Sequence, residues 1–212
     1  MASGDTAGLI VPASQRGALT RAARVVTGGG IVALPTETVF GLATAAGVRS
    51  AEERLRRLKG RSRAKPFQVL ASSARRVARE CRMTSLARRL ASAFWPGPLT
   101  LVLRSMDGRW TGFRVPSHPV AQGLLRRCGG LMLATSANRA GDEPALLAAE
   151  AAAMFGARID MTLDGDPPPT GAPSSVVRAG ADGWQLLREG ALSRETLIEA
   201  AGMPPCGEDT QL

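Results

Sequence analysis

Tyrosine is absent from the 212 residues, asparagine occurs once, as Asn138, and only two of the 27 basic residues are lysines, Lys59 and Lys65. Alanine, arginine and glycine are abundant instead, which is the bias expected of a GC-rich genome. A position that keeps a residue type which the chain otherwise avoids is a candidate functional position. Both lysines lie in the segment LKGRSRAKPF, so the composition directs attention to residues 59–65 and to Asn138.

Cysteine and histidine are also scarce. The three cysteines, Cys81, Cys128 and Cys206, are far apart in the sequence, and His118 is the single histidine. A zinc site needs about four cysteine or histidine ligands at close spacing, so we predict no structural metal. Scattered cysteines in odd number also favour a reducing, cytoplasmic location over a disulfide scaffold.

Long apolar runs are missing as well. The strongly apolar stretches GGLMLATSA and LTLVL are far shorter than the ~20 residues that span a bilayer, and the start, MASGDTAGLIVPASQRG, lacks the pattern of a secretion signal. We therefore expect no membrane role. A hydrophobic content of 44% with 21% charged residues is typical of a globular protein, and the length suits one sizeable core.

Positive charge is concentrated in one part of the chain. Residues 49–89 contain 14 arginines or lysines and three acidic residues, a net charge of +11, whereas the remainder has a net charge of −2. Such a field attracts phosphates, either of a nucleotide or of an RNA, or it belongs to a solvated helix face. Aromatic residues make up only 4% of the chain, which leaves little for stacking RNA bases.

The hydrophobic pattern predicts strands alternating with helices, hence the α/β class with a mixed sheet. We expect a single domain over residues 8–200 with flexible termini at 1–7 and 203–212. A helix over 50–60 is assigned Ser50 as its N-cap and Gly60 as its end. Helices are predicted within 13–30, 50–60, 84–95, 112–130, 143–159 and 183–202. Strands are predicted within 31–34, 66–71, 96–105, 131–137 and 160–180, at the start of 183–202, and as a strand end at the start of 112–130.

Several predicted strands end in turns rich in hydroxyls, amides or cations: PTET, RVP, TSAN, PSSVV and LLREG. Ligands bind at strand ends in α/β sheets because side chains from several strands converge there. The first of these turns, residues 36–38, is expected to be exposed. Each tetrapeptide alone is weak evidence, but their joint occurrence predicts a binding site.

The segment KGRSRAK places four cations, Lys59, Arg61, Arg63 and Lys65, at alternating positions after a helix, where they can surround a polyphosphate. It lacks the spacing of a Walker A loop. Neither His118 nor Cys128 has the neighbours of a nucleophilic triad. An enzyme built on this sequence would therefore act mainly by positioning and electrostatics.

In order along the chain, PTETVFGLA, KGRSRAKPF, WPGPLTLVL, FRVPSHP, TSANRAG, PSSVV and LLREGAL closely resemble the YrdC-like family. The resemblance runs from about Val11 to Leu197 and includes the signature K-x-R followed by S-x-N. It implies one α/β domain, with a twisted mixed sheet and flanking helices around a large basic cavity.

The resemblance also implies an activity, L-threonylcarbamoyladenylate synthase. Such nucleotidyltransferases convert L-threonine, bicarbonate and ATP to threonylcarbamoyl-AMP and pyrophosphate. A partner transferase then moves the threonylcarbamoyl group to the adenosine next to the anticodon of tRNA. ATP would enter with Mg²⁺ as a substrate, with no metal ligand from the protein and no tightly bound cofactor. Residues 49–89 are the expected contact for tRNA or double-stranded RNA.

Residue roles follow from the same resemblance. Lys59 and Arg61 are expected to be catalytic, stabilising charge as pyrophosphate leaves. The expected ATP-binding residues are Lys59, Arg61, Arg63, Lys65, Ser136, Asn138 and Arg188, and the expected threonine-binding residues are Thr36, Thr38, Arg114 and Ser174.

The chain departs from the family pattern at several points. Phe40 stands where tyrosine is usual, Arg178 where an acid is usual, and neither the Ser-Pro that commonly follows S-x-N nor a histidine after the basic loop is present. Three alternatives therefore stay open: an RNA-binding module, a carbamoyl-transfer domain like that of hydrogenase maturation proteins, and a nucleotide-binding paralogue with little synthase activity. The absence of C-x-x-C pairs and the short length argue against the second.

Overall fold

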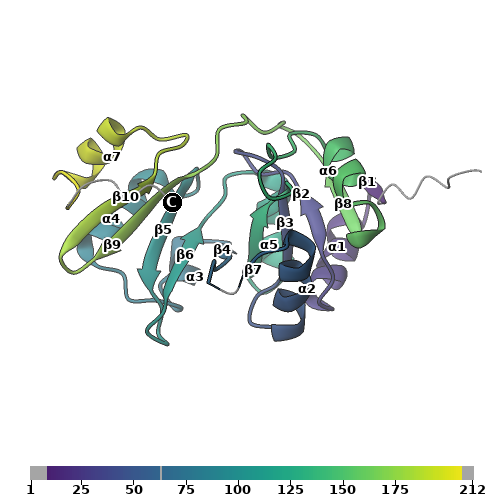
Figure 1. Cartoon of the computed structure of the whole chain (residues 1–212), viewed down its shortest axis with the longest axis horizontal. Helices are drawn as coiled ribbons and strands as arrows, with labels where there is room; N and C mark the ends of the chain where they lie inside the picture. Colours follow the sequence, from purple (N-terminus) through teal and green to yellow (C-terminus); the bar gives the residue numbers. More distant parts are fainter. Residues whose placement is uncertain (1–8, 63, 207–212) are drawn as a thin grey trace, which may run out of the picture.

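The computed structural model describes residues 9–62 and 64–206, which form one ten-stranded mixed sheet with helices packed on it (Figure 1). The strand order is β1-β8-β2-β3-β7-β4-β6-β5-β9-β10. Neighbours β1 and β8, β2 and β8, β4 and β6, and β5 and β9 are parallel, and the other pairs are antiparallel. The predicted α/β class with one mixed sheet is confirmed.

The strands are short, as is usual for a twisted sheet of this size. Their bounds are β1 Ile10–Pro12, β2 Val32–Leu34, β3 Gly41–Ala45, β4 Gln68–Ala71, β5 Leu99–Arg104, β6 Trp110–Arg114, β7 Leu131–Ser136, β8 Met161–Asp164, β9 Ser175–Gly180 and β10 Gly183–Arg188.

The helices of the described residues cover both faces of the sheet. Their bounds are α1 Ala18–Thr27, α2 Arg49–Lys59, α3 Ala74–Val77, α4 Ser85–Phe94, α5 Pro119–Arg127, α6 Ala148–Phe155 and α7 Arg194–Ala201, with a 3₁₀ turn η1 at Gly156–Arg158.

Three apolar clusters hold these layers together. Alternate residues of β2 face opposite sides: Val32 and Leu34 pack with α1 and α5, whereas Ala33 and the preceding Ile31 pack with α2 and α6. A third cluster joins α4 and α7 to β5, β6, β9 and β10 around the buried Trp184. Because α4 and α7 cover one face of these strands, the other face of β5 and β6 is available to line a cavity.

The sequence prediction fails at one helix start and misses three short elements. Helix α2 begins at Arg49, after Val48 as the N-cap residue, with no side-chain cap. Ser50 is therefore wrongly assigned as N-cap, because the helix already includes it. Gly60 ends α2 in the left-handed conformation, as predicted. Strands β1 and β3 and helix α3 are the elements missed; β1 has three residues and α3 four, too few to show a period.

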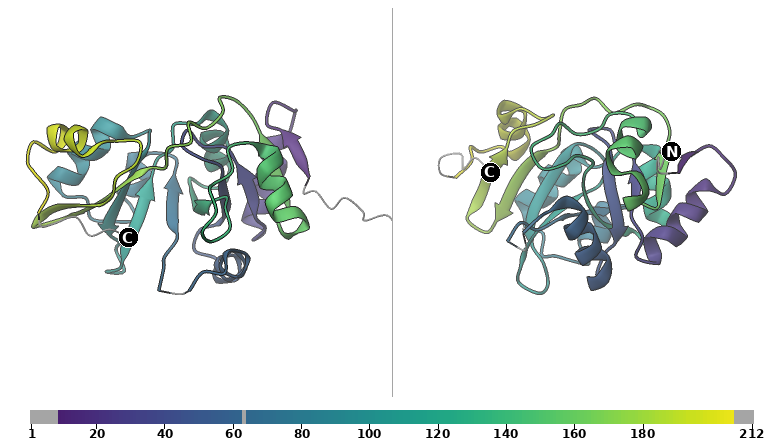
Figure 2. Two further views of the ribbon diagram at one scale, coloured as in Figure 1. Left: turned by 45° about the horizontal axis from the view of Figure 1, so that its top comes forward. Right: turned by 45° about the vertical axis from the view of Figure 1, so that its right-hand side comes forward.

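A crossing segment, residues 165–174, joins β8 in one half of the sheet to β9 in the other, and passes along one edge of the molecule (Figures 1 and 2). Thr170 donates through both its backbone N–H and its hydroxyl to the carbonyl of Glu37, each at 3.1 Å. Gly171 N–H donates to the carbonyl of Thr38 at 2.8 Å. The crossing segment is therefore bonded to the turn that follows β2.

The expected flexible termini lie mostly outside the described residues. Residues 203–206 are described, and they bond to β10: Trp184 Nε1 donates to the carbonyl of Met203, and Cys206 N–H donates to the carbonyl of Trp184. None of the helices within residues 9–62 and 64–206 combines the length and apolarity that a bilayer span requires.

Candidate active site

A cavity of about 420 Å³ lies where the ends of β2 and β7 meet the uncovered face of β4, β5 and β6. Three of the described residues that line it are arginines, and none is acidic. The lining residues are Thr36, Thr38, Val39, Phe40, Gly41, Arg61, Pro66, Phe67, Gln68, Leu70, Thr100, Val102, Trp110, Gly112, Arg114, Ala134, Thr135, Ser136, Asn138, Pro144, Pro173, Ser174, Val176 and Arg188.

The structure brings most of the predicted site residues to this cavity. Eight of the eleven line it: Thr36, Thr38, Arg61, Arg114, Ser136, Asn138, Ser174 and Arg188. Lys59 bonds to Asn138 beside the cavity. Lys65 is exposed and does not belong to the lining, and Arg63 lies outside the described residues.

At one end, Lys59 holds the turn that follows β7. Its ammonium donates to the carbonyl of Ser136 at 3.0 Å, to Asn138 Oδ1 at 2.8 Å and to the carbonyl of Asn138. Ser136 Oγ donates to the same Asn138 Oδ1 at 2.6 Å, and Asn138 Nδ2 donates to the carbonyl of Asp142 at 2.8 Å. An ammonium has three donors, so all three are used in binding this turn.

The cations at this end are partly desolvated. Burial, reinforced by the neighbouring charge of Arg61, lowers the pKa of Lys59 from 10.5 to about 8. Burial, followed by the charge of Arg56, also lowers the pKa of Arg61. Cations held close together in a half-buried place are suited to an anion that neutralises them, as a phosphate does.

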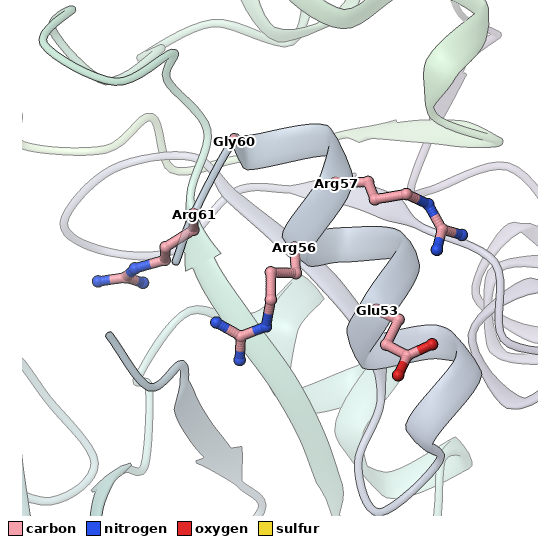
Figure 3. Close-up of a pocket in the computed structure, with 5 residues that line it drawn as sticks. All are labelled: Glu53, Arg56, Arg57, Gly60 and Arg61. Carbon is pink, nitrogen blue, oxygen red and sulfur yellow. The ribbon is translucent and has the colours of Figure 1, made fainter. Parts of the chain in front are cut away.

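A second hollow, of about 380 Å³, adjoins the C-terminal end of α2 (Figure 3). It is lined by Glu53, Arg56, Arg57, Gly60 and Arg61, so Arg61 belongs to the walls of both cavities. The guanidinium carbons of Arg56 and Arg61 lie 5.0 and 5.2 Å from the ring centre of Phe67. This buried ring therefore has a cation–π contact with an arginine of each hollow: Arg61 lines both, and Arg56 lines the second.

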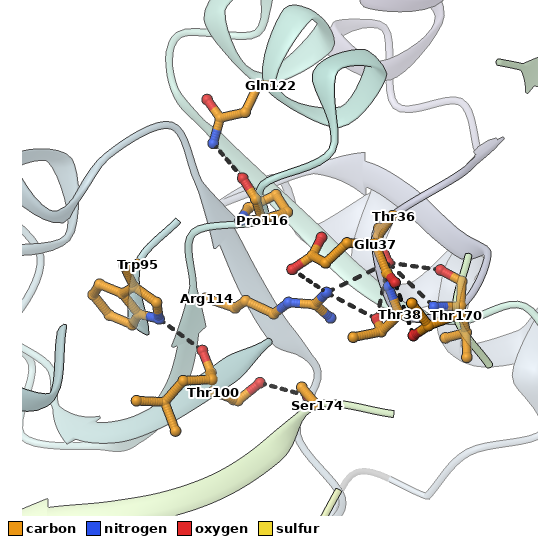
Figure 4. A network of polar contacts seen from close by, with 12 residues as sticks. Thr36, Glu37, Thr38, Trp95, Thr100, Arg114, Pro116, Gln122, Thr170 and Ser174 are labelled. Carbon is orange, nitrogen blue, oxygen red and sulfur yellow. Dashed lines mark hydrogen bonds and ion pairs between the residues drawn. The ribbon is translucent and has the colours of Figure 1, made fainter. Parts of the chain in front are cut away.

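At the opposite end, Arg114 of β6 is almost fully buried beneath the turn that follows β2 (Figure 4). Its Nη2 donates to Thr38 Oγ1 at 2.8 Å and lies 2.8 Å from Glu37 Oε1. Thr36 Oγ1 donates to the carbonyl of Val39 at 2.7 Å, so Thr38 is the donor in the 3.0 Å contact between the two hydroxyls. The Nε of Arg114 is buried without a partner among the described residues.

The turn 36–38 was expected to be exposed, and this is wrong: Thr36 and Thr38 are 3% and 1% exposed. Thr170 and Gly171 of the crossing segment bond to its carbonyls from outside, and Arg114 bonds to its hydroxyls from inside. Both hydroxyls of the turn and the carbonyls of Glu37 and Thr38 have hydrogen-bond partners, which permits the burial, and the Glu37 carboxylate has its ion pair with Arg114 but no hydrogen bond among the described residues. Distant segments supply those partners, so local sequence does not reveal the burial.

A chain of hydrogen bonds crosses the floor of the cavity from β10 to β4. Arg188 donates through Nη2 to Ser174 Oγ at 3.2 Å and to the carbonyl of Ser174 at 2.7 Å. Ser174 Oγ lies 2.9 Å from Thr100 Oγ1, which donates to Gln68 Oε1 at 3.2 Å. Burial, followed by the charge of Arg114, lowers the pKa of Arg188.

Gln68 and Thr100 are cavity residues that the sequence analysis missed. Each lies inside a predicted strand, in PFQVLA and LTLVL, and not in a polar turn. A polar residue within an apolar strand was the available signal, since such a residue needs a partner once buried. Gln68 and Thr100 were not predicted as site residues because the prediction considered only polar residues in turns.

Two of the departures from the family pattern have structural explanations. Phe40 is 2% exposed and packs in the cluster between the sheet and α6, so its ring serves the core without a hydroxyl. The guanidinium carbon of Arg178 lies 5.0 Å from the ring centre of Trp110, whose other cationic neighbour, Arg104, lies at 4.7 Å. Trp110 thus provides Arg178 with a cation–π contact where an acid is usual.

Comparison with known proteins identifies the family to which the chain belongs. The sequence model of Sua5_yciO_yrdC, described as "Telomere recombination", matches residues 24–190, which is most of the chain. The chain belongs to the Sua5/YciO/YrdC family. The predicted resemblance to the YrdC-like family is confirmed, and the match includes every predicted site residue.

Relatives within the Sua5/YciO/YrdC family are close enough to align over most of their length. A threonylcarbamoyl-AMP synthase of Nitrosococcus oceani is 37% identical over 175 residues, covering 78% of this chain and 94% of the relative. A threonylcarbamoyl-AMP synthase of Halorhodospira halophila is 36% identical over 172 residues, covering 76% of this chain and 88% of the relative.

A solved structure of the Sua5/YciO/YrdC family shares the fold. Sua5 of P. abyssi, complexed with L-threonine, superposes with a TM-score of 0.83 and 30% identity over 88% of this chain. The chain spans 58% of the length of that Sua5 chain. The similarity therefore concerns one part of the longer protein.

Proposed function

We propose that this protein is a threonylcarbamoyl-AMP synthase, a nucleotidyltransferase that uses L-threonine, bicarbonate and ATP. The observation that carries the proposal is that one cavity joins two ends of different chemistry. The Lys59–Asn138 turn and Arg61 form one end, and Arg114 with buried hydroxyls forms the other. The names of the family members support the same activity.

The first end is suited to the triphosphate of ATP, which would enter with Mg²⁺ as part of the substrate. Arg61 would bind a phosphate oxygen and stabilise the charge that develops as pyrophosphate leaves. Ser136 and Asn138 would contact the nucleotide from the turn that Lys59 holds. Arg63 and Lys65, from the same basic segment of the sequence, would bind the outer phosphates, and Arg188 would reach the nucleotide from β10.

The second end is suited to L-threonine. Arg114 would pair with its carboxylate, a role to which the buried Nε of this residue lends support. The hydroxyls of Thr36, Thr38 and Ser174 would line the pocket. Thr38 Oγ1 donates its proton to Thr36 Oγ1 and accepts from Arg114 Nη2, so its second lone pair remains an acceptor, which suits the ammonium or hydroxyl group of the amino acid.

The chemistry between the two ends requires no covalent enzyme intermediate. The threonine amine would bond to the carbon of bicarbonate with loss of water, giving a carbamate. A carbamate oxygen would then bond to the α-phosphorus as the bond to the β-phosphate oxygen breaks and pyrophosphate leaves. The protein would orient the reactants and exclude water, because the carbamate and the mixed anhydride both hydrolyse.

We also propose a partner transferase that carries the threonylcarbamoyl group to tRNA, and a cytoplasmic location. A direct contact with tRNA or double-stranded RNA through residues 49–89 is the second candidate role. The specific observation that favours it is the outer hollow with Arg56, Arg57 and Arg61. RNA affinity that falls steeply with salt, without ATP turnover, would favour RNA binding over the synthase.

Pyrophosphate release by the purified protein tests the proposal. Release that requires L-threonine, bicarbonate and ATP together is expected, and omission of either co-substrate should abolish it. Arg61→Ala and Lys59→Ala should each reduce release by about 10- to 100-fold, the effect of losing a hydrogen bond to a charged group. Arg126→Ala, at an exposed arginine on α5 outside residues 49–89, is the matched control and should leave the rate unchanged. No release with bound ATP would contradict the synthase and favour the nucleotide-binding paralogue.

A further inference from the structure

The side chain of Gln68 spans from β4 to β5 although β6 lies between these strands. This reach depends on Gly112 of β6. A Cβ at Gly112 would lie 3.3 Å from Thr100 Cγ2 and 3.8 Å from Gln68 Cβ, so any larger side chain would fill the gap between the two. A glycine within a strand often marks such a close approach.

The first and last groups of the hydrogen-bond chain across the cavity floor determine which atom donates in each of its bonds. Arg188 can only donate, and Gln68 Oε1 can only accept. Because Thr100 gives its single proton to Gln68 Oε1, Ser174 must give its proton to Thr100, and Ser174 in turn accepts from Arg188. The relay therefore runs from Arg188 through Ser174 and Thr100 to Gln68.

This relay fixes the orientation of the Gln68 amide. Its oxygen is held by Thr100, so its Nε2, with two N–H donors, is on the other side of the group. Gln68 is half-buried and lines the cavity, and no described residue accepts a hydrogen bond from Nε2. Nε2 is also not among the polar atoms buried without a partner, so it is accessible from the cavity.

Gln68 lies between the phosphate end and the threonine end of the proposed site. It follows directly on the segment that carries Arg61 and Phe67, and it bonds to Thr100, which bonds to Ser174 of the threonine end. In the proposed reaction the one-carbon unit connects the threonine amine to the α-phosphorus. That unit must therefore lie between the same two ends, and its oxygens carry the negative charge.

We propose that Gln68 binds the one-carbon oxyanion, that is, bicarbonate and the carbamate formed from it, through its Nε2 donors. Thr100 is a positioning residue that turns the amide so that nitrogen, and not oxygen, faces the oxyanion. The relay ends on a guanidinium at Arg188, so the same group that is proposed to reach the nucleotide also sets this orientation. This inference rests on the proposed synthase function.

Steady-state kinetics of pyrophosphate release in degassed buffer, with bicarbonate varied, tests the inference. Gln68→Leu keeps the size of the side chain and removes its donors. We expect the KM for bicarbonate to rise by about 10- to 100-fold, the effect of one lost hydrogen bond to a charged group, with the KM values for threonine and ATP changed by less than about twofold. Gln68→Glu places a negative charge next to the oxyanion, so its KM for bicarbonate should rise further than that of Gln68→Leu.

Thr100 provides the test of the relay. Thr100→Val removes the hydroxyl and should raise the KM for bicarbonate in the same way. Thr100→Ser keeps the hydroxyl, so its KM for bicarbonate should stay close to that of the wild type. Gln185→Leu is the matched control, because Gln185 lies on β10 outside the cavity lining. Calorimetric binding of L-threonine without bicarbonate should be unchanged in Gln68→Leu, which shows that the variant is folded.

Two results would overturn the inference. A rise in the KM for threonine and not for bicarbonate would place Gln68 on the amino acid, and an unchanged KM for bicarbonate would remove it from the site. If Gln68→Leu does not fold, the pair Thr100→Val and Thr100→Ser decides the question. Failure of the wild-type protein to release pyrophosphate is a different result, because it contradicts the proposed function and, with it, the ligand named for Gln68.

Discussion

The ammonium nitrogen of Lys59 lies 2.8 Å from the side-chain oxygen of Asn138, so one of the two lysines of the chain bonds to its single asparagine. The same ammonium bonds to the carbonyls of Ser136 and Asn138. Lys59 at the end of α2 and the turn after β7 therefore form one unit, although 79 residues separate Lys59 from Asn138.

A double-mutant cycle should show that Lys59 and Asn138 act together. Lys59→Ala and Asn138→Ala are each expected to lower kcat/KM for ATP by about 10- to 100-fold. Residues in one network are non-additive, so the double variant should lie within about threefold of the worse single variant. Asn138→Ala combined with Thr38→Val, from the other end of the cavity, is the control pair, and its losses should multiply. Multiplying losses for Lys59 and Asn138 would show that Lys59 acts independently of the turn.

The charge of Lys59 should make ATP use dependent on pH. Burial lowers its pKa to about 8, so the free protein loses the ammonium charge and one of its three donors as pH rises through that value. We expect kcat/KM for ATP, which reports the free enzyme, to fall above pH 8. In Lys59→Arg the guanidinium stays charged, and the fall should move to higher pH. A profile with the same upper limb in both proteins would assign the limb to another group.

The Glu37–Arg114 pair should respond to threonine. Arg114 is 3% exposed, and removing the partner of a buried ion pair costs about 3–5 kcal/mol, so Glu37→Gln should lower the melting temperature. If threonine places its carboxylate at Arg114, it restores the missing negative charge. The rise in melting temperature on adding L-threonine should therefore be larger in Glu37→Gln than in the wild type.

L-threonine methyl ester, which lacks the carboxylate, is the control ligand for this measurement. It should produce no extra rise in Glu37→Gln. An equal rise with the ester and with threonine would show that the carboxylate of the amino acid lies elsewhere.

His118 should contribute stability that acid removes. Its Nδ1 accepts from Val120 N–H at 3.2 Å, which caps α5, and its Nε2 donates to the carbonyl of Pro167 in the crossing segment at 2.8 Å, so the ring is neutral. Burial lowers the pKa of His118, opposed by the Pro167 bond and by the charges of Glu37 and Asp166. The unfolded chain therefore takes up a proton first, at about pH 6.5, and stability falls as pH falls below that value.

NMR titration measures this directly, because the chain has a single histidine. The imidazole midpoint should lie below 6.5. In His118→Asn, which can still cap α5, the loss of stability between pH 7 and 5 should be smaller than in the wild type. A midpoint above 6.5 would contradict the neutral, buried ring.

The periodic elements were predictable because their pattern is local. The helices α1, α2 and α4 and the strands β2, β5 and β7 lie where the spacing of apolar residues indicates. The N-cap of α2 was misplaced because Ser50 already has a helical position, and β1 was missed because three residues carry no period. Of the site, the turns with Thr36, Ser136 and Ser174 were found because small polar residues stand out after apolar strands.

By itself, the sequence determined the family blocks, the α/β class and the concentration of positive charge in residues 49–89, since each is a property of neighbouring residues. The tertiary structure decided which polar groups meet. Burial of the turn 36–38 depends on the crossing segment and on Arg114, and the orientation of Gln68 depends on a strand that is not adjacent to its own. Hydrogen bonds between distant segments satisfy buried polar groups one partner at a time, and only the folded chain shows which partner each group has.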